Sequence, residues 1–203
     1  MKKLFMVIAL AAMTMSANAQ KVGIWYGLGF NKITNLKVDG VSTADANMST
    51  KMYSSPANFG VTYTQEMGNF DLTGGLSFRQ KGTKVEGSGK KAWKPKFLQF
   101  DVLGTYNFYK NEEGTSKFGI QTGPYVALMT SKDGAYKDAV RTCDVGWQVG
   151  VAAAYANTTF SAGYEFGFVK LYKDEMFKEL GAAKVKGTLN QGIYIKVGYQ
   201  FGL

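Results

Sequence analysis

The last sixteen residues, TLNQGIYIKVGYQFGL at positions 188–203, decide the fold. From Gly192 onward every second side chain is apolar, and the positions between hold glycine or polar residues. Such alternation is typical of a β-strand with one apolar face. A strand at the end of a chain has an unpaired edge unless a neighbour lies on each side, and closure of a barrel against the first strand supplies both neighbours.

Seven earlier stretches alternate in the same way, so we expect eight strands. These stretches are residues 22–31, 57–66, 70–80, 97–109, 117–130, 143–155 and 159–171. Long polar connections at 32–56, 81–96, 131–142 and 172–187 alternate with shorter ones. That asymmetry is typical of an outer-membrane barrel. The sequence therefore predicts an all-β, eight-stranded antiparallel up-and-down transmembrane barrel with four longer extracellular loops and three shorter periplasmic turns.

Two local features accompany these strands. Pro124 has no amide hydrogen to donate, so it predicts a bulge or a local break in pairing. In the last connection, Asp174 is placed to cap a short helix that ends before Gly181.

The N-terminus has the pattern of a secretory signal. Lys2 and Lys3 precede an apolar run at 4–13, and Ala17-Asn18-Ala19 forms an A-x-A cleavage site. We expect residues 1–19 to be a cleaved signal peptide and residues 20–203 to form one barrel domain; an uncleaved membrane helix is the alternative. The net charge of +9 includes the two signal lysines, which leaves +7 on the mature chain.

Composition argues against several kinds of chemistry. Histidine is absent, which excludes a histidine-based hydrolytic triad. Cys143 is the single cysteine, so no intrachain disulfide can form. There is no phosphate-binding loop or calcium loop. We expect no enzymatic activity, no catalytic or metal-binding residues and no cofactor.

The main competing architecture is an exported soluble barrel of the lipocalin type. In that barrel the apolar face points inward around a ligand, and the outside is polar. The polar face of this chain consists mostly of Gly, Thr, Ser, Ala and Gln, whereas a soluble exterior would be rich in Lys and Glu. The small side chains favour a narrow interior and hence the membrane barrel.

A few charged residues share this polar face and should lie inside the barrel. They are Arg79, Asp101, Asp144, Glu165 and Lys196. Unpaired buried charge is costly, so we expect ion pairs between Arg79 and Asp101 and between Glu165 and Lys196. A proton or ion path is the functional alternative.

The connection at 81–96 is strongly basic. It contains Lys81, Lys84, Lys90, Lys91, Lys94 and Lys96, and its single acid is Glu86, so six lysines less one acid give a net +5. Facing outward, such a loop should attract lipopolysaccharide phosphates. The alternative is a solvated loop without a ligand.

The C-terminal strand resembles the assembly signal of bacterial outer-membrane barrels. The matching residues are Lys196, Gly198, Phe201 and Leu203, with Leu203 where an aromatic residue is usual. The Lys-Gly pair that ends 76–82, the strand at 97–108, Gly123-Pro124 and Gly163-Tyr164 are also similar to a known family. That family is the porin-like outer-membrane β-barrel domain of Gram-negative bacteria.

We expect a monomeric, non-enzymatic envelope protein with a structural or surface-binding role. Its expected partners are outer-membrane lipid, lipopolysaccharide and the outer-membrane assembly machinery, with no nucleic acid. A small porin-like channel is the alternative function, and an exported ligand-binding barrel is the third.

Overall fold

The computed structural model describes residues 20–34, 37–38, 41–42, 50–85, 92–131, 141–169, 185–186 and 189–202. In these ranges no helix is long and apolar enough to cross a membrane. The expected signal peptide, the expected helix after Asp174 and the terminal Leu203 lie outside the described residues. Cleavage after Ala19 therefore stays a prediction.

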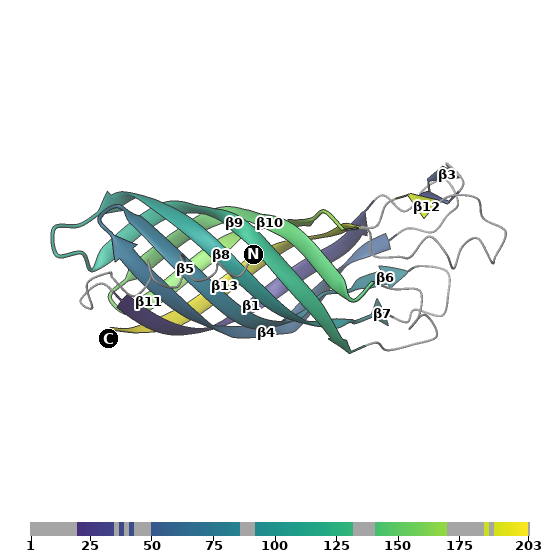
Figure 1. Ribbon diagram of the computed structural model, residues 1–203, viewed down its shortest axis with the longest axis horizontal. Helices are drawn as coiled ribbons and strands as arrows, with labels where there is room; N and C mark the ends of the chain where they lie inside the picture. The colour runs from purple at the N-terminus through teal and green to yellow at the C-terminus, as the bar shows by residue number, and fades with distance from the viewer. Residues whose placement is uncertain are drawn as a thin grey trace, which may run out of the picture.

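Eight long strands close into an antiparallel barrel (Figure 1). They are β1 (Gln20–Thr34), β4 (Thr50–Met67), β5 (Phe70–Gln80), β8 (Lys96–Lys110), β9 (Ser116–Ser131), β10 (Cys143–Tyr155), β11 (Thr158–Gly167) and β13 (Leu189–Gly202). Each strand pairs with its successor along the chain, and β1 pairs with both β4 and β13. The barrel thus has up-and-down order, and the C-terminal strand has a partner on each edge, as its sequence predicts.

The two ends of the barrel differ in their connections. Short turns join β4 to β5, β8 to β9 and β10 to β11, and the C-terminus lies at the same end (Figure 1). Gly68, Gly114 and Ala156 in these turns have positive φ angles of 64°, 68° and 50°. The short turns face the periplasm, and the longer connections at the opposite end are extracellular.

Within the described ranges, five short strands lie at the extracellular end (Figure 1). β2 (Lys37–Val38), β3 (Val41–Ser42) and β12 (Val185–Lys186) form a small sheet that joins the first and last loops. β6 (Thr83–Val85) pairs with the first residues of β4, and β7 (Ala92–Trp93) pairs with β6. Because β4 continues into this extension, it begins at Thr50 rather than at the expected residue 57.

The apolar face of every long strand points outward. Ile24, Val61 and Ile195 are 54%, 50% and 49% exposed, whereas Gln99 and Gln148 on the other face are fully buried. In a lipocalin the apolar face points inward, so the arrangement here is the reverse. An apolar outer surface is the one that a lipid environment requires. Aromatic side chains pack on the outer surface near the periplasmic end, where the rings of Phe108 and Phe118 lie 5.0 Å apart.

Strand β9 passes through Pro124 without interruption. Trp147 of β10 pairs with Pro124, but on the other side β8 has no pair between Asp101↔Tyr125 and Gly104↔Thr122. The register is the same before and after this gap, so Pro124 causes a local break in pairing and no bulge. The sequence predicted one or the other.

Candidate functional site in the barrel interior

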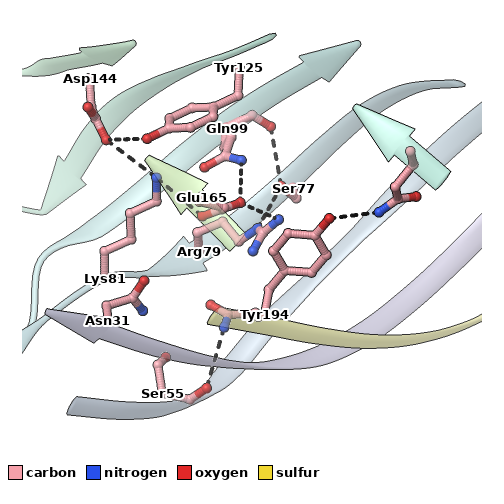
Figure 2. A network of polar contacts seen from close by, with 12 residues as sticks. Asn31, Ser55, Ser77, Arg79, Lys81, Gln99, Tyr125, Asp144, Glu165 and Tyr194 are labelled. Carbon is pink, nitrogen blue, oxygen red and sulfur yellow. Dashed lines mark hydrogen bonds and ion pairs between the residues drawn. The ribbon is translucent and has the colours of Figure 1, made fainter. Parts of the chain in front are cut away.

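Four charged side chains form a buried network near the extracellular end of the lumen, here called the outer cluster: Arg79, Lys81, Asp144 and Glu165 (Figure 2). Arg79 Nη2 lies 3.0 Å from Glu165 Oε1. Lys81 Nζ lies 3.4 Å from Asp144 Oδ2 and 3.7 Å from Glu165 Oε2. Each of these side chains is at most 5% exposed, so the ion pairs are shielded from water.

Neutral groups complete the outer cluster. Gln99 Nε2 donates a hydrogen bond of 3.2 Å to Glu165, and the Tyr125 hydroxyl donates one of 3.2 Å to Asp144 (Figure 2). Lys81 Nζ also lies 4.1 Å from the centre of the Tyr125 ring. These contacts connect the cluster to two further strands, because Gln99 belongs to β8 and Tyr125 to β9.

The outer cluster crosses the lumen. In the closed ring of eight strands, β5 and β11 are four strands apart in either direction, so they face each other across the barrel. Arg79 comes from β5 and Glu165 from β11, and their ion pair therefore joins opposite walls. An eight-stranded barrel has an interior that side chains can fill, and here charged side chains fill the extracellular half.

A second charged group, the periplasmic cluster, lies where β1 and β9 begin and β4 ends. Lys21 and Lys117 each have Nζ 2.7 Å from Glu66 Oε1, and Lys117 Nζ is 3.6 Å from Asp71 Oδ1. Asn107 Nδ2 donates a 2.8 Å hydrogen bond to Asp71. Lys117 and Glu66 come from strands three apart in the ring, so this cluster also spans part of the lumen.

Between the clusters, Lys196 and Asp101 face the middle of the barrel. Lys196 Nζ lies 4.8 Å from the ring centre of Trp25 and 4.6 Å from that of Tyr194. The Tyr194 hydroxyl accepts a 2.7 Å hydrogen bond from Gln121 Nε2 of β9. Lys196 is 8% exposed and Asp101 is 3% exposed.

The pairing predicted from the sequence differs from the pairing in the structure. Arg79 meets Glu165 and not Asp101, because Asp101 is opposite Gly75 in the ladder, four residues before Arg79 in β5. Lys196 is likewise opposite Ser161 of β11, four residues from Glu165. Strands in a barrel are tilted, so interior side chains at one height come from staggered positions.

Lys81 is also corrected. We expected it in the basic extracellular loop, but it is 2% exposed and belongs to the outer cluster. Without Lys81, the basic stretch has five lysines against Glu86, or +4. Lys94 and Lys96 are exposed, Lys84 lies in β6, and Lys90 and Lys91 lie outside the described residues.

Sequence reasoning missed the periplasmic cluster, although a signal for it exists. Lys117 alternates with the outward-facing Phe118 and Ile120, which places it on the inward face of β9.

The residues of the expected assembly signal lie on both faces of β13. Lys196 points inward, Phe201 is 49% exposed on the outside, and Gly198 is half-buried. Leu203 lies outside the described residues.

Among the residues that the structure describes, the buried positive and negative charges are equal in number. Arg79, Lys81, Lys117 and Lys196 are four cations, and Asp71, Asp101, Asp144 and Glu165 are four anions. A neutral interior offers no selectivity for cations or anions. Most of the carboxylates are also held by lysine or arginine, which does not favour acid–base chemistry.

Comparison with known proteins agrees with this geometry. The family described as outer membrane protein β-barrel domain matches residues 18–173. The chain belongs to this family. The match ends before β13, the strand that closes the barrel of this family member.

Solved structures of outer-membrane barrels are similar. OprG of Pseudomonas aeruginosa has a TM-score of 0.55 and 11% identity, covering 93% of this chain and 99% of that chain. Neisserial surface protein A has a TM-score of 0.46 and 13% identity, covering 92% and 99%. Ail of Yersinia pestis, solved with the heparin analogue sucrose octasulfate, has a TM-score of 0.40 and 18% identity, covering 90% and 99%. Curated proteins gave no match.

Together, the family and the fold establish a porin-like integral protein of the outer membrane. OprG shares the architecture at an identity that supports the fold alone.

Proposed function

We propose that this protein is a non-enzymatic component of the outer membrane, with a structural or surface-binding role and no continuous pore. The observation that carries the proposal is the Arg79–Glu165 ion pair, which joins opposite walls of the lumen at 3.0 Å. A solute that crossed the barrel would have to separate these buried charges. The absence of histidine and the pairing of most buried carboxylates favour a role without catalysis.

Planar-bilayer recording tests this role against the small-channel alternative. We expect the refolded wild-type protein to give no discrete conductance steps. The double variant Arg79→Ser with Glu165→Ser keeps the charge balance but removes the side chains that cross the lumen, so it should give small steps. Steps of equal size in both proteins would contradict the proposal and favour the channel.

The surface-binding role concerns the remaining lysines of the basic loop, Lys84, Lys90, Lys91, Lys94 and Lys96. Lys96 is the first residue of β8 and shares its outward face with Leu98 and Phe100, which are 41% and 52% exposed. A lysine at the upper edge of an apolar surface can extend its stem over that surface and its ammonium toward the head groups. We propose that these lysines contact lipopolysaccharide phosphates.

Neutral substitution of the loop should weaken binding of lipopolysaccharide to the refolded protein. A lysine near an anionic surface contributes about 1 kcal/mol, which corresponds to roughly a fivefold change in affinity. Lys96→Gln should therefore weaken binding about fivefold at low salt, and Lys90, Lys91, Lys94 and Lys96 changed together should weaken it further and flatten its salt dependence.

The matched control is Lys110→Gln. Lys110 is the exposed last residue of the same strand, at the periplasmic end. The Lys110→Gln variant removes one positive charge, as Lys96→Gln does, but at a position far from the outer leaflet. Equal weakening by the two single variants would mean that binding follows net charge and not this loop.

A further inference from the structure

The periplasmic half of the lumen holds a cavity of about 110 Å³. Small side chains leave this space, among them Ala152, Ala154 and Ser161. The cavity runs from the half-buried Glu66 and Gln200 near the periplasmic strand ends up to Asp101 and Lys196 in mid-barrel.

Asp101 and Lys196 differ from the other buried charges. Among the described residues, neither has an opposite charge within 4.0 Å, and neither side chain forms a hydrogen bond. Both line the cavity, at 3% and 8% exposure, and they attract each other across a distance that exceeds an ion pair. A buried charge without an ion-pair partner is costly, and the cavity has two such charges of opposite sign on its wall.

We propose that this cavity is a binding site for a small zwitterion, whose carboxylate meets Lys196 and whose ammonium meets Asp101. A zwitterion satisfies both charges and leaves the neutral interior neutral. An anion alone would leave Asp101 unpaired and add net charge, and a cation alone would do the same to Lys196. The rings of Trp25 and Tyr194 beside Lys196 shield that end from water, which strengthens the interaction.

The size of the cavity and the route into it restrict which ligands can bind. An engineered apolar cavity of about 150 Å³ holds benzene, so a cavity of 110 Å³ suits a solute with fewer heavy atoms. The outer cluster closes the route from outside, so the ligand must enter from the periplasm. There it passes Lys21 and Glu66, whose side chains are 29% and 19% exposed.

Glycine is the smallest probe with both charges, and acetate and methylammonium each have one of them. The full chain, refolded in detergent micelles, would have Trp93 and Trp147 changed to Phe, which leaves Trp25 as the only tryptophan of the three. Trp25 fluorescence should then respond to glycine in a saturable way. Acetate and methylammonium should bind at least tenfold more weakly.

Three variants locate the site. Lys196→Met and Asp101→Asn should each weaken glycine binding at least tenfold. Ala152→Met fills the cavity and keeps both charges, and it should also abolish the response. The control Lys110→Met, on the outer surface, should leave it unchanged. A heat-dependent shift in gel mobility would verify that each variant is folded.

Three results would overturn the proposal, and the first two need only the single-tryptophan protein. A folded protein without a saturable glycine response would mean that water alone fills the cavity. Acetate binding as tight as glycine would mean a site for anions and not for zwitterions. A folded Ala152→Met variant with unchanged affinity would move the site away from this cavity.

Discussion

Replacement of Glu165 by leucine should lower the free energy of unfolding of the barrel by about 3–5 kcal/mol, the range for breaking a buried ion pair. Glu165 lies 3.0 Å from Arg79 and 3.7 Å from Lys81. Among the described residues, its loss leaves the guanidinium of Arg79 in contact with the rings of Trp25 and Tyr194 and with Ser77, whereas Lys81 keeps Asp144 at 3.4 Å. The penalty comes mainly from the unpaired buried arginine.

Reversible urea unfolding in lipid vesicles, followed by tryptophan fluorescence, measures this change. Glu165→Gln should cost less, because an amide oxygen can still accept from Gln99 and Arg79. The control is Glu113→Leu, an exposed position in the periplasmic turn, which should change stability by no more than about 0.5 kcal/mol. A Glu165→Leu barrel as stable as this control would contradict the buried pair.

A double-mutant cycle then identifies the partner. Changing Arg79 and Glu165 together to leucine removes one charge of each sign, so the double variant should be much less destabilised than the sum of the single variants. The cycle between Arg79 and Asp101, the pair expected from the sequence, should show a smaller coupling energy. A larger coupling energy between Arg79 and Asp101 than between Arg79 and Glu165 would support the pair expected from the sequence instead.

The architecture could be predicted because lipid imposes a simple rule. Each strand must be apolar toward the lipid, and the side-chain period of two makes that rule visible at every second residue, as from Ile193 to Phe201. The short turns and long loops then set the orientation. The largest differences in strand boundaries lie at the extracellular end, where β4 begins at Thr50 instead of residue 57 and β11 ends at Gly167 instead of residue 171.

The interior contacts could not be predicted in the same way. Alternation determines that Arg79 and Glu165 point inward, but not which residues share a height, because register and tilt depend on the whole closed ring. Adjacent strands suggested Asp101 for Arg79, and the partner lies instead on the opposite wall. The cavity likewise depends on where small side chains of several strands coincide.

Lys81 illustrates a recoverable error. Its position in a lysine-rich stretch suggested a solvated loop, yet it continues the inward series of odd residues Ser77 and Arg79 in β5. The alternation of inward and outward positions predicted the place of Lys81 better than the local composition did. The chain stays close to the barrel wall for one residue beyond Gln80, the last residue of β5. Lys81 N still donates to the Pro95 carbonyl at 3.1 Å.

Gly123→Val should prevent the barrel from folding, and Gly123→Ala should destabilise it by more than about 3 kcal/mol, beyond the usual cost of overpacking. A Cβ at this position would overlap the Val102 carbonyl oxygen of β8, with the Val102 carbonyl carbon at 2.9 Å and Leu103 Cα at 3.0 Å. These are backbone atoms, so no side-chain rotation relieves the overlap. Strands β8 and β9 would have to separate where pairing is already interrupted beside Pro124.

Gly74→Ala is the matched control, since Gly74 also lies within a membrane strand but has no atom within 4 Å of an added Cβ. It should leave stability unchanged or raise it by about 0.5–1 kcal/mol, because glycine within a strand is less favourable than alanine. Heat-dependent gel mobility scores folding of Gly123→Val, and urea unfolding compares the two alanine variants. Equal stability of Gly123→Ala and Gly74→Ala would mean that β8 and β9 are further apart than the structure has them, because the contact that demands glycine would then not exist.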